Sequence, residues 1–225
     1  MKQFIKQNGI YFLLYGIILL FCASLLLSED KVQIHGIINS YVGHPIIDVF
    51  FKYFTHLGDG AFAILLIAVF YFINVKKANY ILFSYTSSAL LTGILKIYFY
   101  SPTWRPAFVY QYFATNNHIT LIDGVEMHYG NSFPSGHATS AFAVFICLLL
   151  ITNIQWQKIL FLLMAILAAY SRTYLSQHWL VDIVIGSIIG TSFALLFYAI
   201  YYLKNTNNKY NVTIINLLNK KNKSV

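Results

Sequence analysis

The chain has 225 residues, of which 58% are hydrophobic and only 10% are charged, with a formal net charge of +8. A typical soluble domain carries about 25% charged residues, so this composition excludes an ordinary water-soluble globular protein. We expect an all-α, polytopic membrane protein built as a single domain.

Six apolar segments are expected to form helices. In chain order they lie at 10–27, 60–74, 80–100, 137–153, 158–175 and 178–203. About 20 helical residues cross the hydrocarbon core, a length that the second and fourth segments reach only with flanking residues. The first segment follows a basic N-terminus but ends without a small-x-small cleavage site. We therefore interpret it as an uncleaved membrane helix, not a signal peptide.

The two cysteines, Cys22 and Cys147, both lie inside apolar segments, and neither has the spacing of a metal site. A single disulfide between them is one interpretation. Two small buried residues is the interpretation we favour. Lipidation of Cys22 is rejected because Phe21 stands where a lipoprotein cleavage site needs a small residue.

Two long connections, about 28–59 and 101–136, fall on the same side of the predicted helices. Helical spacing of apolar residues in the first predicts a short interfacial helix. The second holds His, Arg and aromatic residues, and long loops of this kind often carry function. Asp59 in the stretch HLGDG and the aromatic run FVYQYF are candidates for reading a ligand. A structural role is the favoured interpretation for both.

Charge placement predicts the orientation of the chain. With the N-terminus in the cytoplasm, ten basic residues fall on the cytoplasmic side and five on the other, while all seven acidic residues fall on the outer side. This follows the positive-inside rule. The basic surplus is therefore interpreted as a topology signal, not as a nucleic-acid surface. Residues 204–225 are expected to form a polar, loosely ordered cytoplasmic tail.

The stretch SRTYLSQHWLVD places His178 four residues before Asp182. On a helix these side chains share a face. The carboxylate of Asp182 can then accept the Nδ1–H of His178 and leave the Nε2 lone pair free to attack. Such a pair is a candidate nucleophile or general base. A satisfied buried pair and metal ligation are the alternatives.

The stretch NSFPSGHATS precedes the fourth apolar segment. A helix N-terminus carries free N–H groups and binds anions. Ser135 can cap the helix or donate its hydroxyl, Gly136 permits close approach of a ligand, and His137 can protonate a departing oxygen. His137 has no carboxylate nearby in the sequence. The alternative is a helix cap with an incidental histidine.

Ionisable residues in membrane segments are costly and by default indicate function. The predicted topology brings six of them to the outer face: Lys96, Arg105, His137, Arg172, His178 and Asp182. Guanidinium groups suit bidentate phosphate binding, although each arginine alone would be read as an interfacial anchor or a loop cation. Cations around a phosphate make a metal unnecessary, and no carboxylate cluster for one is present. No cofactor is expected.

These stretches resemble the type 2 phosphatidic acid phosphatase family, which also includes the vanadium haloperoxidases. Pro134-Ser135-Gly136-His137 is similar to the family's second motif. Ser171-Arg172, His178 and Asp182 are similar to its third, with both spacings intact. Arg105-Pro106 resembles the first motif, but eight residues separate Lys96 from Arg105 where the family usually has six. A snorkelling lysine is the alternative for Lys96.

The resemblance implies about six transmembrane helices over residues 1–203, with the active site at the outer face of a bacterial inner membrane and both termini cytoplasmic. It implies that His178 attacks phosphorus to form a phosphohistidine, Asp182 orients it, and His137 protonates the leaving oxygen. The implied phosphate-binding groups are Lys96, Arg105, Ser135, Gly136 and Arg172.

The same resemblance implies a lipid phosphatase that needs no metal and that vanadate inhibits. The implied substrates are undecaprenyl diphosphate, phosphatidylglycerol phosphate, phosphatidic acid or lipid A. A lipid phosphotransferase and a non-catalytic lipid-binding or transport protein are alternatives. A haloperoxidase is disfavoured because those members are soluble. The expected partners are a lipid phosphate and the bilayer, without nucleic acid; the oligomeric state is left open.

Overall fold

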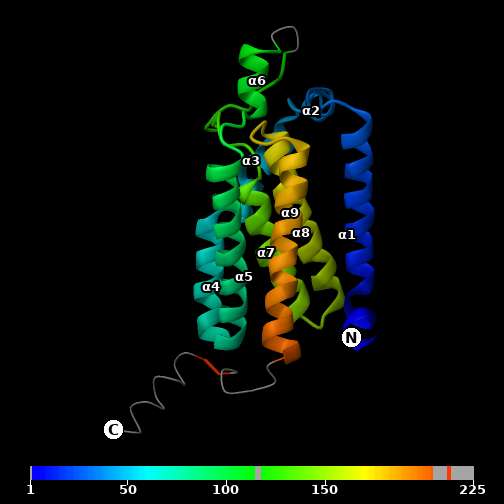
Figure 1. The fold of residues 1–225 in the computed structure, drawn as a ribbon, viewed down its shortest axis with the longest axis vertical. Helices are drawn as coiled ribbons and strands as arrows, with labels where there is room; N and C mark the ends of the chain where they lie inside the picture. Colours follow the sequence, from blue (N-terminus) through cyan, green and yellow to red (C-terminus); the bar gives the residue numbers. More distant parts are fainter. Residues whose placement is uncertain (1, 115–117, 205–211, 214–225) are drawn as a thin grey trace, which may run out of the picture.

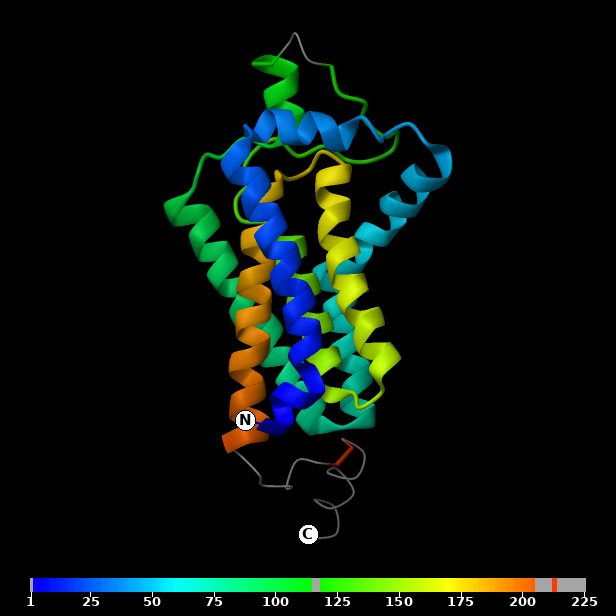
Figure 2. The same ribbon diagram turned by 90° about the vertical axis from the view of Figure 1, so that its right-hand side faces the viewer.

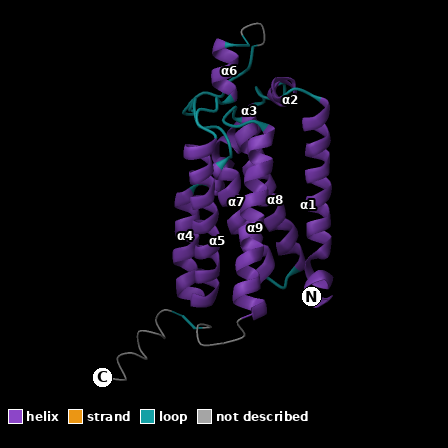
Figure 3. Ribbon diagram, in the orientation of Figure 1, coloured by secondary structure: helices purple, strands orange, loops and turns teal. Residues whose placement is uncertain are grey.

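The computed structural model describes residues 2–114, 118–204 and 212–213, and within these ranges all regular structure is helical (Figure 3). The all-α prediction is therefore confirmed. The helices are α1 (Lys2–Ser28), α2 (Lys31–Asn39), α3 (Pro45–Phe54), η1 (Thr55–Gly58), α4 (Gly60–Ile73), α5 (Val75–Ile94), η2 (Leu95–Phe99), α6 (Pro106–Tyr112), α7 (Gly136–Ile151), α8 (Gln155–Tyr174), α9 (Leu180–Tyr198) and η3 (Ala199–Lys204). Of these, η1 is a 3₁₀ helix, and η2 and η3 are π-helical.

Helix α7 forms the centre of the bundle, with α5, α8 and α9 packed around it (Figure 1). Every residue from Ala138 to Leu150 is buried, as expected for a helix that is apolar on all sides. Two glycines of α9 permit close contact with α7. A Cβ on Gly186 would lie 2.6 Å from the carbonyl oxygen of Ser135, and one on Gly190 would collide with that of Thr139. This small-xxx-small spacing is typical of membrane helix pairs.

The outward faces of the helices are apolar. Leu13, Leu20, Phe21 and Leu27 of α1 are each more than half exposed, which suits contact with lipid chains and not with water. Three helices are long and apolar enough to span a membrane, or four if the pair formed by Pro45–Gly58 and Gly60–Ile73, bent by 57°, is one span. The chain is thus a membrane protein. Each of the six predicted segments overlaps a helix, but six spans stay a prediction.

Several helix boundaries predicted from hydropathy were wrong. Helix α1 begins at Lys2 instead of residue 10. Helix α5 begins at Val75 instead of 80, since the side chain of Asn74 accepts the N–H of Lys77. The first long connection folds into α2, α3 and η1 instead of one short helix. Figure 2 shows α2 lying across one end of the bundle.

Helix α1 begins and η3 ends at one end of the bundle, while α2 and α6 lie at the other (Figure 1). The predicted tail, 204–225, falls almost wholly outside the described residues. Both cysteines are free, so the disulfide alternative is excluded; Cys147 is buried and Cys22 is half-buried.

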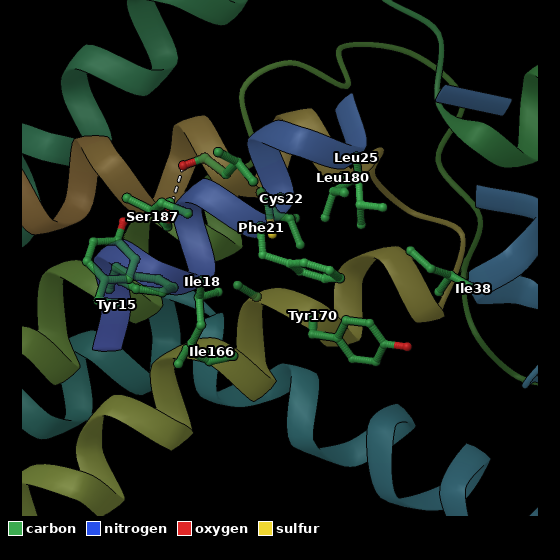
Figure 4. Close-up of a pocket in the computed structure, with 15 residues that line it drawn as sticks. Tyr15, Ile18, Phe21, Cys22, Leu25, Ile38, Ile166, Tyr170, Leu180 and Ser187 are labelled. Carbon is green, nitrogen blue, oxygen red and sulfur yellow. Dashed lines mark hydrogen bonds between the residues drawn. The ribbon is translucent and has the colours of Figure 1, made fainter. Parts of the chain in front are cut away.

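An apolar groove of about 300 Å³ lies between α1, α8 and α9 (Figure 4). Its polar feature is a hydrogen bond of 2.8 Å between the hydroxyls of Tyr15 and Ser187. The residues that line the groove carry no charge. The groove therefore suits a hydrocarbon chain and not a phosphate group.

Candidate active site

The turn between α8 and α9 positions His178. The backbone N–H groups of Gln177 and His178 both donate to the carbonyl of Arg172, at 2.9 and 3.1 Å. Ser176 has a positive φ of 56°, which is typical of a residue in a tight turn. His178 therefore precedes α9 instead of belonging to it, so the prediction that both members of the pair lie on the helix was wrong. Only Asp182 is helical, in the first turn of α9.

The carboxylate of Asp182 is held by three donors. Its Oδ2 accepts from the Ser132 hydroxyl at 2.5 Å, from the Trp179 N–H at 3.0 Å and from Nδ1 of His178 at 3.3 Å. The N–H of Trp179 fixes the carboxylate at the start of α9, and Ser132 ties it to the loop before α7. Asp182 is thus held both by the start of α9 and by the loop before α7, and it contacts Nδ1 of His178 although His178 lies outside the helix.

His178 is 1% exposed. Burial lowers the pKa of its imidazole well below the usual value, and the positive charges of Arg105 and Arg172 lower it further. The ring is therefore neutral at physiological pH. With Nδ1–H donated to Asp182, Nε2 keeps its lone pair, which is the form that a nucleophile or general base requires.

The two arginines reach the site from different elements. Arg105, at the N-terminus of α6, donates through Nε to the Gly130 carbonyl at 2.9 Å and through Nη1 to the carbonyl and side-chain oxygens of Gln177, at 3.2 and 3.1 Å. Arg172, at the end of α8, donates through Nη1 to the Thr55 hydroxyl at 2.8 Å. The buried Nε of Arg172 has no hydrogen-bond partner among the described residues. An unpaired buried N–H is costly, so this group is available to an anion.

Lys96 lies in the π-helical turn η2 and is half-buried. It is close enough to Arg105, Arg172 and Asp182 to interact with them electrostatically. The structure therefore brings Lys96 to the same cluster despite its longer spacing from Arg105. π-helical turns recur at functional sites.

The N-terminus of α7 faces the same cluster. Ser135 is the N-cap, and its hydroxyl accepts the N–H of Ala138 at 3.3 Å. Its own N–H donates to the carbonyl of Asp182 at 3.1 Å, which joins the start of α7 to the start of α9. A Cβ added to Gly136 would meet no atom within 4 Å. The backbone there is open to a ligand, as the sequence predicts.

His137 has a carboxylate partner that its sequence neighbourhood does not contain. Its Nε2 lies 2.5 Å from Oδ1 of Asp59, which directly follows η1. The other oxygen of Asp59 lies 2.7 Å from Nδ1 of His56. The structural role predicted for Asp59 from the sequence did not include this contact. The feature of the sequence that could have indicated this contact is HLGDG, where a glycine on each side of Asp59 allows close packing.

Two cavities flank the cluster. One of about 510 Å³ is lined by Thr55, His56, Asp59, His137, Arg172 and Gln177, together with Lys52, Glu126 and His128 from the two long connections. The other, of about 410 Å³, reaches Asp182 and Ser132 and is lined by Lys31, Tyr100 and Trp179. Val109, from the run FVYQYF, lines the second cavity. In the part of the chain that the structure describes, no group of three or more His, Cys, Asp or Glu side chains could hold a metal ion.

Known proteins resemble the chain over the region that holds these residues. A dihydrosphingosine 1-phosphate phosphatase of Schizosaccharomyces pombe is 29% identical over 170 residues, which cover 70% of this chain and 39% of that protein. A lipid A 4′-phosphatase of Bacteroides thetaiotaomicron is 39% identical over 71 residues, 32% of each chain. The chain thus spans well under half the length of both relatives.

The crystal structure of Aquifex aeolicus LpxE has a TM-score of 0.63 to this chain at 27% identity. The match covers 77% of this chain and 94% of that one. The family model of the PAP2 superfamily matches residues 77–206, more than half of the chain. This range contains Lys96, Arg105 and the residues of both later motifs, but not Asp59. The chain belongs to the PAP2 superfamily.

Proposed function

We propose that the chain is an integral membrane lipid phosphatase that hydrolyses a lipid phosphomonoester or diphosphate through a phosphohistidine at His178, without a metal ion. One observation carries the proposal. The buried Nε of Arg172 is unpaired among the described residues and lies beside the neutral His178 ring, its Asp182 partner and the open N-terminus of α7. Together these groups form a positively charged site that can bind an anion next to the candidate nucleophile, His178.

In the first step, Nε2 of His178 attacks phosphorus. The N–P bond forms as the bond from phosphorus to the lipid oxygen breaks, and the ring becomes positively charged. Asp182 stabilises that charge through Nδ1, 3.3 Å away. His137 gives a proton to the leaving oxygen, which departs as the lipid alcohol or, from a diphosphate, as the lipid monophosphate.

In the second step, water attacks the phosphohistidine. The proton of the water passes to His137, the N–P bond breaks, and inorganic phosphate leaves with His178 neutral again. His137 acts as acid in the first step and as base in the second, so both histidines return to their starting state. Hydrolysis therefore needs no net proton supply.

The phosphate-binding groups in this proposal are Lys96, Arg105, Arg172, the Ser135 hydroxyl and the Gly136 N–H. Phosphoryl transfer depends chiefly on alignment and on charge stabilisation. Removing one donor of this kind lowers kcat by about 10²–10³-fold. The three cations supply the charge that a metal ion provides in other phosphatases.

The substrate class follows from the membrane fold and the relatives. The two relatives' names place a phosphate on a sphingoid base and on lipid A, and both are lipids. A site at one end of a membrane bundle lets the headgroup reach the cluster while the chains stay in the bilayer. In the proposed orientation both termini are cytoplasmic and the site faces the exterior of a bacterial inner membrane. The distribution of acidic and basic residues supports it.

The test is phosphate release from a panel of lipid phosphates in detergent or nanodiscs, including a monophosphate and a diphosphate. The wild type is expected to release phosphate in EDTA and to be inhibited by vanadate, a mimic of the pentacoordinate state. His178→Ala and His137→Ala are expected to abolish release. A magnesium requirement together with full activity of His178→Ala would overturn the proposal. Transfer of the phosphoryl group to an added alcohol in preference to water would favour the phosphotransferase.

A further inference from the structure

A second His–Asp pair lies opposite the first. Nε2 of His137 and Oδ1 of Asp59 are 2.5 Å apart, and Asp59 is held on its other oxygen by His56, at 2.7 Å. His56 is largely exposed, with 66% of its side chain accessible, whereas His137 and Asp59 are about 30% accessible. The three linked side chains, His56, Asp59 and His137, therefore run from the exposed surface of the cavity inward to the first turn of α7.

Two glycines bring Asp59 to this position. A Cβ on Gly58 would lie 3.0 Å from the carbonyl oxygen of His137, and one on Gly60 would lie 2.7 Å from the Tyr85 hydroxyl. Because neither residue has a side chain, the break between η1 and α4 fits against the first turn of α7 on one side and against α5 on the other. The two glycines of HLGDG thus allow the close packing that places the Asp59 carboxylate beside His137.

We propose that Asp59 is a positioning residue for His137, a role that rests on the phosphatase reaction proposed above. The carboxylate holds the proton on Nε2 of His137, so that Nδ1 is the nitrogen that exchanges a proton with the leaving oxygen. It also stabilises the imidazolium, which is the form able to act as an acid. His56 braces the second carboxylate oxygen. The site then contains two His–Asp pairs. His178–Asp182 serves the attack on phosphorus, and His137–Asp59 serves the departure of the lipid oxygen.

The charges around His137 explain why it needs a carboxylate. Burial lowers the pKa of His137, the hydrogen bond to Asp59 raises it, and the charges of Arg172 and Arg105 lower it further. The remaining titratable or charged groups that line the same cavity are His56, Lys52, Glu126 and His128. Without Asp59, burial and the arginines would lower the pKa of His137 further and make the imidazolium still harder to form. In the second step the proton from water returns to Nδ1, so the role of Asp59 is the same in both halves of the reaction.

The experiment compares two leaving groups. Departure of an alkyl oxygen from a lipid phosphate needs a proton, whereas departure of nitrophenolate from an aryl phosphate needs little help. Asp59→Asn is expected to lower kcat/KM, which reports departure of the leaving group but not the later hydrolysis common to both substrates, by about 10²-fold or more on the lipid phosphate and by about tenfold or less on the aryl phosphate. His137→Ala is expected to show the same pattern. The double variant is expected to lose little beyond His137→Ala alone, because the two residues act as a unit.

The matched control is Asp123→Asn, which makes the same change of charge in an exposed loop residue and is expected to leave both rates unaltered. If Asp59→Asn fails to fold, His56→Ala takes its place, since His56 is exposed. It is expected to show the same selectivity for the alkyl leaving group with a smaller loss. Equal losses on both substrates, or losses that add fully to those of His137→Ala, would overturn the positioning role. A wild type that releases no phosphate from either substrate would instead overturn the phosphatase proposal itself.

Discussion

Nδ1 of His178 lies 3.3 Å from Oδ2 of Asp182 although only Asp182 belongs to a helix. The turn after α8 places the ring, and the first turn of α9 places the carboxylate. Three donors converge on that carboxylate oxygen. Two of them, the Ser132 hydroxyl and the Trp179 N–H, hold the carboxylate without His178, so we expect the carboxylate to orient the ring.

Asp182→Asn tests this relationship. An amide can turn its N–H₂ toward His178 and favour the tautomer with its proton on Nε2, which cannot attack. We expect kcat on a lipid phosphate to fall by about 10²–10⁴-fold, with KM changed little. Steady-state phosphate release measures both. A variant with wild-type kcat would show that the carboxylate does not orient the nucleophile.

Arg172→Lys keeps the charge but removes the guanidinium fork and its unpaired Nε. We expect kcat/KM to fall by about 10²-fold and vanadate to inhibit more weakly. Lys6→Gln, an exposed cation near the N-terminus, is the control and is expected to behave like the wild type. Unaltered vanadate inhibition of Arg172→Lys would mean that Arg172 does not bind the phosphate.

Two glycine substitutions separate ligand approach from helix packing. Gly136→Ala adds a methyl group to open space, so the Tm is expected to stay near the wild-type value while substrate binding weakens. Gly190→Ala places the same methyl group against the backbone of α7 and is expected to cost about 1–3 kcal/mol of stability. Thermal unfolding and KM are measured for both. A large fall in Tm for Gly136→Ala would contradict the open approach to α7.

Protonation of His35 is expected to make the stability of the protein depend on pH. It lies buried in α2 beside Tyr110 and Trp179, with Nε2 3.1 Å from the Ser176 hydroxyl in the turn that precedes His178. Burial lowers its pKa to about 4, against about 6.5 in an unfolded chain. The unfolded state therefore binds more protons between these values, and stability is expected to fall as the pH drops from about 6.5 toward 4.

The measurement is the Tm at a series of pH values for the wild type and His35→Asn, which cannot take up that proton. His35→Asn is expected to show a flatter fall below about pH 6.5. The control, His44→Asn, changes an exposed histidine and is expected to keep the wild-type slope. Equal slopes for His35→Asn and the wild type would show that His35 does not titrate on unfolding.

Sequence reasoning located the parts of the site that are close together in the chain. Arg172 lies near the end of α8, His178 in the following turn and Asp182 at the start of α9, so their short separation in the chain is enough to bring them together. The capped start of α7 was equally local. Asp59 could not be placed in this way, because its contact with His137 depends on how η1 packs against α7. The glycines on either side of it were visible, but the neighbour that required them was not.

Lys96 illustrates a second limit. Its distance along the chain from Arg105 differs from the family pattern, and an ideal α-helix gave no reason to expect the two side chains in one cluster. The π-helical turn η2 carries Lys96, and hydropathy does not distinguish a π-helix from an α-helix. The start of α5 was missed for a related reason, because the side chain of Asn74 caps the helix before its apolar run begins.

The central claim is that His178 carries the phosphoryl group during the reaction. The most direct measurement is rapid acid-free quenching of the enzyme with a ³²P-labelled lipid phosphate, followed by mapping of the labelled peptide. The account predicts one label on His178, stable in base and lost in acid, that is absent from His178→Ala and from vanadate-treated protein. Phosphate release without any labelled enzyme in a single turnover, or a label on another residue, would contradict it.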